Sequence, residues 1–237
     1  APRLEYDHMF SSISPRENAD RLRETARDLG FSVAGVADVS SVRETFRLPE
    51  NLRNRFVRAA VLGVRLLDGV LEDLVDRPTP LYFHHYRQLN FFLDREAFRL
   101  AARIQAAGFL ALPIPSSQIL DSQRQTAHVS HKKLAVLAGL GHIGRNNLLV
   151  HPAFGSRLRL VTVLTDMPLE AGIQTKADCG TCAACLASCP AEAIKMNPAE
   201  FDHRACFEKL DEFRRIRLVS QHICGLCVKA CRGRGQA

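Results

Sequence analysis

All eight cysteines of this chain lie in its last quarter, between residues 179 and 231, and residues 1–178 contain none. A secreted domain held together by disulfides would use cysteine along its whole length and would need an oxidising compartment. A chain of 237 residues can bury a core large enough to fold without such cross-links. The cysteines are therefore expected to bind metal.

The first four cysteines follow the spacing C-x2-C-x2-C-x3-C-P, which runs from Cys179 to Pro190. This is the spacing of a bacterial ferredoxin-type [4Fe–4S] site, in which the fourth cysteine binds a second cluster. By analogy with two-cluster ferredoxins, we expect two sets of four ligands. The first set is Cys179, Cys182, Cys185 and Cys231, and the second set is Cys189, Cys206, Cys224 and Cys227.

Zinc is the alternative metal for these thiolates. Two zinc sites of four thiolates each would more usually show separated CxxC pairs, and they would not call for a third cysteine two residues further on. Residues 207–223, which separate Cys206 from Cys224, have a helical and basic pattern and are expected to pack against another part of the protein. This insertion removes no ligand.

The cysteine-free part has the mixed helix and strand signals of an α/β fold. A capping box at Ser14–Glu17 predicts a helix to about Leu29, which Gly30 stops. Apolar residues at spacings of three and four over residues 89–107 predict a long amphipathic helix. Strands are predicted at 31–38, 58–66, 109–115 and 157–166, and a further helix at 128–137. We expect an α/β domain over residues 1–170 and a small ferredoxin-like domain with two clusters over residues 171–237.

The chain carries 32 basic and 25 acidic side chains, a net charge of +7 that favours anionic partners only weakly. It contains no run of about 18 apolar residues, so no transmembrane helix is predicted. Its N-terminal residues show no apolar segment of the kind that secretory signals contain.

Residues 139–147, GLGHIGRNN, contain the letters of a dinucleotide-binding motif. A predicted helix precedes them where a Rossmann turn needs a strand, and no P-loop is present, so a nucleotide site is not expected. Gly139, Gly141 and Gly144 would allow the backbone to approach a large flat or phosphate-bearing ligand. The structural alternative is a helix cap followed by a turn.

Residues 138–166, followed by the cysteine segment 179–190, resemble the epoxyqueuosine reductase family, which is related to the reductive dehalogenases. The resemblance is carried by the Gly139–Arg145 stretch, the Phe154–Ser156 segment and the strand that ends in Leu164-Thr165-Asp166. It implies a nitroreductase-like α+β domain that binds cobalamin, two [4Fe–4S] clusters, and an external low-potential electron donor of ferredoxin or flavodoxin type. It also implies a corrin site lined by Gly139, Gly141, His142, Gly144, Arg145, Asn147, Phe154 and Gly155.

The proton donor departs from the family's pattern. Gln125 stands where the family has an acidic proton donor, and glutamine cannot act as a general acid. Asp121, His128 and His131 are the nearby alternatives. Tyr86 is a further catalytic candidate, by resemblance to the dehalogenases only.

Two further departures concern the substrate. His142 replaces the family's usual tryptophan, and the sequence stops six residues after Cys231, where the family often continues into a helical-repeat domain that helps to hold tRNA. We therefore expect a small-molecule substrate, with tRNA as the less favoured alternative.

Two functions are compatible with these features. The first is an iron–sulfur oxidoreductase that passes electrons through both clusters to a cobalamin, which reduces the substrate. The second is a non-catalytic electron-transfer protein that serves a partner redox or corrinoid enzyme. In either case, oxygen-sensitive clusters favour a cytoplasmic protein.

Overall fold

The computed structural model describes residues 14–121 and 125–233. The chain forms two compact units, each assembled from three separate segments. The first unit lies within Ala1–Val64, Asn90–Leu140 and Arg159–Gln174, and the second within Arg65–Leu89, Gly141–Leu158 and Thr175–Ala237. Each unit is described by itself.

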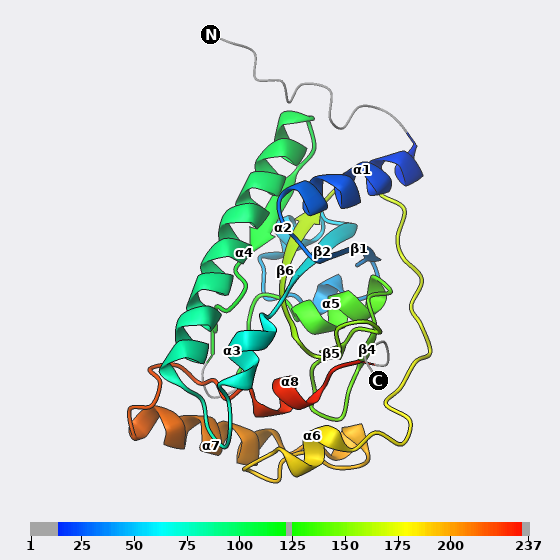
Figure 1. Ribbon diagram of the computed structural model, residues 1–237. Coiled ribbons are helices and arrows are strands. Elements are labelled where there is room, and N and C mark those ends of the chain that lie inside the picture. The colour runs from blue at the N-terminus through cyan, green and yellow to red at the C-terminus, as the bar shows by residue number, and fades with distance from the viewer. Residues whose placement is uncertain (1–13, 122–124, 234–237) are drawn as a thin grey trace. The chain divides into compact units, whose positions relative to one another are not determined.

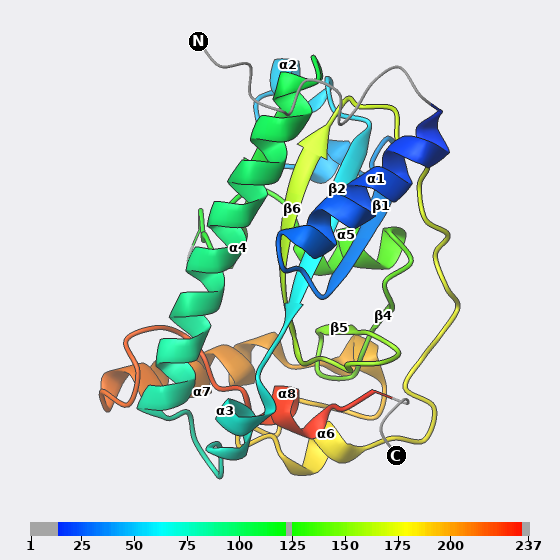
Figure 2. The ribbon, with the colours of Figure 1, turned by 45° about the horizontal axis from the view of Figure 1, so that its top comes forward.

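A four-stranded sheet organises the first unit (Figures 1 and 2). Its order is β1 (Val33–Asp38), β2 (Arg58–Arg65), β6 (Leu158–Thr165) and β3 (Ala111–Ile114). The β1–β2 and β3–β6 pairs are antiparallel, with Val33 opposite Gly63 and Ala111 opposite Thr165. All four predicted strands are confirmed, and the fold is of the mixed α/β type. Between β1 and β2 lie a 3₁₀ turn (Arg43–Thr45) and the short helix α2 (Glu50–Arg53).

One face of this sheet is covered by α1 (Pro15–Asp28) and by the second half of α4 (Pro80–Ala106). The predicted capping box opens α1: the Ser14 hydroxyl accepts from the Glu17 amide at 3.3 Å, and the Glu17 carboxylate accepts from the Ser14 amide at 3.0 Å. The common core of helices and strands contains Ala19, Leu22, Ala26, Leu93, Ala97, Leu100, Ile104, Ala60, Leu62, Val161 and Val163.

The opposite face of the sheet receives α5 (His131–Leu137). Thr162 alternates with the core residues Val161 and Val163, so its side chain points to the other side of β6. There its hydroxyl lies 2.8 Å from Nδ1 of His131, at the start of α5.

The second unit is built from short elements around the cysteines. These are α3 (Asp68–Glu72), the first half of α4, β4 (His142–Ile143), β5 (Leu149–Val150), α6 (Ala184–Ala187), a 3₁₀ turn (Pro198–Glu200), α7 (His203–Arg215) and α8 (Leu226–Ala230). Their apolar core is formed by Leu66, Leu71, Leu74, Tyr82, Phe213, Val219, Ile223 and Leu226. The helix predicted within residues 207–223 is present as α7, which buries Phe213 in this core.

One helix differs in extent from the sequence-based expectation. Helix α4 begins at Pro80, well before the predicted apolar pattern, because its first turns bury a different set of side chains in the second unit. Residues 65–89 and 141–158 pack with the cysteine segments in the second unit. Arg157, for example, donates to the Lys229 carbonyl at 2.5 Å. Among the described residues, no helix is both long enough and apolar enough to cross a membrane.

Candidate metal centre

All eight cysteines lie in the second unit, within the described residues, and all eight are free thiols. Three of them stand on short helices: Cys185 on α6, Cys206 on α7 and Cys227 on α8. The other five occupy the segments that flank these helices. The sequence therefore folds into a unit whose secondary structure serves mainly to hold the cysteine segments.

The four thiols of the first predicted set lie together. Burial, and then the neighbouring charges of Cys231, Cys179 and Cys182, raise the pKa of Cys185 to about 11. The amide of Cys182 also donates to the Cys179 carbonyl at 3.1 Å, which curls the loop between these two ligands.

The thiols of the second predicted set also lie together. Burial raises the pKa of Cys224 to about 11, and the charges of Cys206 and Cys189 add to this shift. Burial and then the charges of Cys224, Cys206, Cys189 and Cys185 raise the pKa of Cys227. Because Cys185 is among these neighbours, the two sets adjoin.

This donor set fits iron–sulfur clusters better than single metal ions. Within the described part of the chain, no three His, Cys, Asp or Glu side chains converge closely enough to hold one ion. A [4Fe–4S] cluster binds each of its thiolates at a different iron, so its ligands stand further apart than those of one ion. Cysteine binds metal as the thiolate and not as the thiol. Because burial raises the pKa values of these thiols, their deprotonation costs free energy that cluster binding must supply.

Arg145 follows β4 and holds the loop of the first set. Its guanidinium is almost fully buried, with 8% of the residue exposed. The Nη1 and Nη2 groups each donate at 2.7 Å, to the carbonyls of Cys182 and Gly180 respectively. Nε donates to the Met196 carbonyl at 2.6 Å. The donors of Arg145 are thus directed at the protein's own backbone.

The Phe154–Ser156 segment contacts the last cysteine of the first set. The Ser156 amide donates to the Cys231 carbonyl at 3.3 Å. Gly155 has φ +58, and a Cβ there would overlap the same carbonyl, so only glycine fits this position. Phe154 stacks on His151 with ring centroids 5.0 Å apart. This segment positions Cys231, a role that the sequence did not reveal.

The glycines of the 139–147 stretch contact neighbouring parts of the chain. A Cβ on Gly139 would lie 2.6 Å from the Ile173 carbonyl, a Cβ on Gly141 would overlap the Val150 carbonyl, and a Cβ on Gly144 would lie 2.5 Å from the Val150 side chain. These internal contacts already account for glycine at the three positions. As predicted, a helix (α5) and not a strand precedes the stretch.

His142 and Asn147 are two further predicted cofactor-binding residues. His142 lies beside a cysteine, and Asn147 lies near the start of α7. His142 Nε2 is 3.6 Å from Sγ of Cys179. The side-chain amide of Asn147 is 3.4 Å from Nε2 of His203. A corrin-binding role for the residues of this stretch stays a prediction.

Two of the candidate proton donors each lie near a part of Arg47 in the first unit. A carboxylate oxygen of Asp121 is 3.9 Å from Nη1 of Arg47, and Nδ1 of His128 is 3.0 Å from the Arg47 carbonyl. Asp121 and Thr126 pair through their backbones and set Gln125 in a turn with φ +50.

The other two candidates, His131 and Tyr86, pack against neighbouring residues of the protein. His131 has both ring nitrogens engaged, Nδ1 with the Thr162 hydroxyl and Nε2 with the Pro115 carbonyl at 3.1 Å. Burial lowers the pKa of His131 to about 4, so the ring is neutral near pH 7. Tyr86 belongs to the second unit, where it packs against the apolar core.

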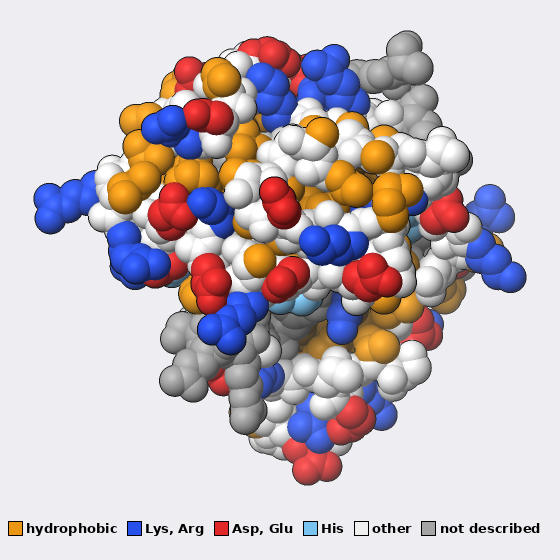
Figure 3. Space-filling view, turned by 90° about the horizontal axis from the view of Figure 1, so that it is seen from below, with side chains coloured by type: hydrophobic (Ala, Val, Ile, Leu, Met, Phe, Trp, Pro, Cys, Tyr) orange, Lys and Arg blue, Asp and Glu red, His pale blue; other side chains and the backbone are white. Residues whose placement is uncertain are grey.

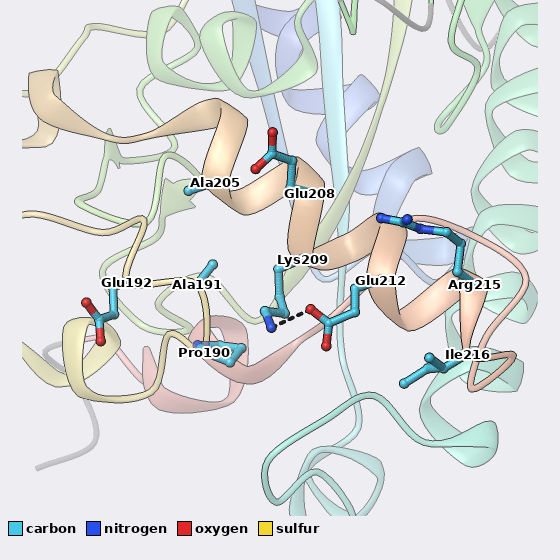
Figure 4. A pocket seen from close by; sticks show the side chains of 9 residues that line it. All are labelled: Pro190, Ala191, Glu192, Ala205, Glu208, Lys209, Glu212, Arg215 and Ile216. Atoms are coloured by element: carbon cyan, nitrogen blue, oxygen red, sulfur yellow. Dashed lines mark hydrogen bonds and ion pairs between the residues drawn. The ribbon is translucent and has the colours of Figure 1, made fainter.

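A groove of about 760 Å³ runs along α7 beside the second set of thiols (Figure 4). One wall is formed by residues 190–192, which directly follow Cys189. The other wall is α7, which carries Cys206. An ion pair of 2.6 Å joins Lys209 to Glu212 within it. The lining residues are Pro190, Ala191, Glu192, Ala205, Glu208, Lys209, Glu212, Arg215 and Ile216. No signal in the sequence predicted this groove.

No family model matches the chain, whereas individual relatives do. An epoxyqueuosine reductase from Leadbetterella byssophila is 38% identical, over 82% of this chain and 70% of that protein. One from Aliivibrio fischeri is 33% identical, over 92% of this chain and 67% of that protein. The chain belongs to the epoxyqueuosine reductase family. The resemblance predicted from residues 138–190 is thereby confirmed.

Solved structures share the fold of this family member. A catabolic reductive dehalogenase in complex with 3-bromo-4-hydroxybenzoic acid superposes with a TM-score of 0.74 at 19% identity, over 92% of this chain and 32% of that chain. The epoxyqueuosine reductase from Streptococcus thermophilus gives a TM-score of 0.60 at 19% identity, over 91% and 65%. The chain spans 62% of the length of the relatives from Cyclobacterium marinum and Pseudomonas aeruginosa.

Proposed function

We propose that this chain is an iron–sulfur reductase in which two [4Fe–4S] clusters deliver electrons to a cobalamin that reduces the substrate. The observation that carries the proposal is the gathering of eight free thiols into two adjoining groups of four, in a member of the epoxyqueuosine reductase family. Support for cobalamin comes from the family and from a related structure described as a B12-dependent dehalogenase. When bound, cobalamin supplies a low-valent cobalt that reacts with the substrate.

The chain's own residues hold the clusters and supply a proton. The first set of thiols would hold the cluster nearer to the cobalamin, and the second set would hold the outer cluster. Asp121, near the Arg47 guanidinium, and His128, near the Arg47 carbonyl, are the candidate proton donors. The proposal includes the finer fold, a nitroreductase-like domain over residues 1–170 followed by a ferredoxin-like domain over residues 171–237. It also places the protein in the reducing cytoplasm, where thiols stay free.

We propose that electrons enter at the groove along α7. The groove is lined by Pro190 and Ala205, the sequence neighbours of the predicted ligands Cys189 and Cys206 (Figure 4), and most of its lining residues are exposed. A small electron-transfer protein of ferredoxin or flavodoxin type could dock there and approach this cluster.

For the substrate, we favour a small molecule. Gln125 and His142 both depart from the family's pattern, and the first of these removes the family's acidic proton donor. Acidic and basic side chains alternate on the face seen in Figure 3, so the net charge of +7 does not form one basic patch there. The second candidate is tRNA, because a related epoxyqueuosine reductase has been solved with a modified tRNA stem loop.

Salt dependence distinguishes the two substrate classes. A tRNA substrate that contacts several phosphates would bind with an affinity that falls steeply as salt is added. We expect weak binding of a tRNA stem loop at physiological salt. Tight binding with a steep salt dependence would instead establish tRNA as the substrate.

The proposal is tested by metal and corrinoid analysis of protein purified without oxygen and incubated with cobalamin. We expect about eight irons and one cobalt per chain, the content of two four-iron clusters and one corrin. Dithionite should then bleach the cluster absorbance and change the corrin spectrum. The same iron content without cobalt would refute the reductase and make the chain an electron relay for a partner enzyme.

A further inference from the structure

Arg145 is a buried cation without a carboxylate partner. It is 8% exposed, and its three donor groups end on the backbone carbonyls of Gly180, Cys182 and Met196. No ion pair between Arg145 and a carboxylate is present among the described residues. Arg157, the other deeply buried arginine of this unit, differs in this respect because it pairs with Asp68 at 2.9 Å.

A buried guanidinium is costly unless an opposite charge compensates it. Carbonyl dipoles satisfy its N–H groups but leave its full positive charge in place. Two of the three carbonyls belong to the loop that carries Cys179 and Cys182, so the guanidinium lies against the backbone of this ligand loop. The same loop presents the Cys179 and Cys182 thiols, which become thiolates when a cluster binds. It also carries the carboxylate of Asp178, which accepts from the Gly180 amide at 2.8 Å.

The turn between β4 and β5 fixes the position of this charge. The side-chain amide of Asn146, the next residue, donates to the Ser156 hydroxyl at 2.9 Å, and both residues are buried. The Ser156 amide in turn donates to the Cys231 carbonyl. The same turn thus contacts the Cys179–Cys182 loop directly and is linked to the Cys231 segment through Ser156.

We infer that Arg145 is the counter-ion of the first cluster and raises its reduction potential. The inference rests on the two-cluster part of the proposed function and does not depend on cobalamin. One-electron reduction by an external reductant adds one negative charge to the cluster and changes no covalent bond. A fixed positive charge nearby stabilises the reduced cluster more than the oxidised one. Arg145 is therefore a positioning residue whose charge acts through the ligand loop.

Charge and geometry can be separated by substitution. Lysine keeps the positive charge but cannot span three carbonyls, because it lacks the planar fork of arginine. Glutamine removes the charge and keeps some hydrogen bonding. R145K should therefore keep the reduction potential of the first cluster close to its original value but hold the ligand loop less tightly. R145Q should lower that potential and should also hold the loop less tightly.

The experiment is a redox titration monitored by electron paramagnetic resonance, on the full chain with reconstituted clusters and no cobalamin. We expect R145Q to shift one of the two cluster potentials to a more negative value and to leave the other unchanged. R145K should keep that potential close to that of the unsubstituted chain and lose iron to a chelator several-fold faster. The matched control is R77Q, which removes an exposed arginine of the same unit that pairs with Asp76.

Each outcome decides the inference. An R145Q chain with both clusters at unchanged potentials would overturn it. If the R145Q chain does not hold the first cluster, the R145K chain gives the test. An unchanged reduction potential of the first cluster in R145K supports the counter-ion role of Arg145. A large negative shift of that potential, although the positive charge is kept, contradicts this role. Loss of the cluster from both variants would make Arg145 a purely structural clamp and also overturn the inference. A chain with about eight irons but no cobalt refutes the proposed function and leaves this inference standing.

Discussion

The ring of Tyr82 occupies the space that any side chain at position 225 would need. A Cβ on Gly225 would lie 2.5 Å from Cζ of Tyr82, and the residue has φ +90, a conformation that glycine adopts without strain. Gly225 stands between Cys224 and Cys227, two ligands of the second set. Tyr82 comes from the start of α4 and is 4% exposed in the core of this unit. The packing of α4 is thus coupled to the geometry of the second ligand set.

We therefore expect Gly225→Ala to disrupt this unit. The positive φ and the overlap with a buried ring should together lower the free energy of unfolding by roughly 2–4 kcal/mol. The second cluster should be lost more readily than the first. Chemical unfolding and iron analysis measure the two effects.

Gly69→Ala is the matched control. Gly69 belongs to α3 in the same unit, and a Cβ there would meet nothing within 4 Å. Because alanine favours helix, this variant should be as stable as the unsubstituted chain or slightly more stable. Equal stability of the two alanine variants would show that the contact with Tyr82 is unimportant.

Single cysteine substitutions should remove one cluster at a time. Cys231→Ser takes a ligand from the first set, and Cys206→Ser takes one from the second. Each variant should keep about four of about eight irons, and the two should retain clusters with different resonance spectra and potentials. Identical spectra in the two variants would show that the ligands are divided in another way.

The part of the site that the sequence could predict is local. The spacing from Cys179 to Pro190 indicates a cluster because those ligands come from one loop, and the capping box at Ser14 indicates a helix start for the same reason. The cysteine spacing and the capping box are both formed by residues only a few positions apart. The strands were predictable because β-branched apolar runs mark a sheet whichever partners they pair with.

The part that could not be predicted depends on distant segments. Arg145 binds carbonyls 35 to 51 positions further along the chain, and Gly155 is required by the Cys231 carbonyl. Within the sequence, Arg145 belongs to the glycine-rich stretch 139–147, which suggested a ligand-binding loop, and Gly155 belongs to the Phe154–Ser156 segment. The division into two units was equally hidden, because residues 65–89 join the cysteine unit through their buried side chains and carry no cysteine themselves.

His131 makes the stability of the first unit depend on pH. Burial lowers the pKa of His131 in the folded state to about 4, below the ordinary value of 6.5, so protonation favours the unfolded state. The stability that the neutral ring contributes is present in full above about pH 6.5 and is lost as the pH falls toward 4. The loss should be on the order of 1–3 kcal/mol.

The measurement is urea unfolding at several pH values between these limits. H131Q cannot take up this proton on unfolding, so its stability should fall less steeply with decreasing pH than that of the unsubstituted chain. H203Q, which replaces an exposed histidine, serves as the control and should keep the full slope. Parallel curves for all three chains would contradict the role of His131.

Blocking the groove along α7 should slow electron entry from a protein donor. Ala205 lines the groove next to Cys206, and a bulky side chain there would fill space that a donor protein needs. We expect A205W to be reduced several-fold more slowly by a reduced ferredoxin in stopped-flow experiments. Dithionite, which is small, should reduce A205W as fast as it reduces the unsubstituted chain.

A control variant separates docking from general damage to the second cluster. Ala199 lies in the exposed 3₁₀ turn before α7 and does not line the groove, so A199W should leave both rates unchanged. A slower reaction of A205W with dithionite as well would point to a perturbed cluster. Unchanged reduction of A205W by ferredoxin would place the entry of electrons elsewhere on the protein, since the docked donor would then not occupy this groove.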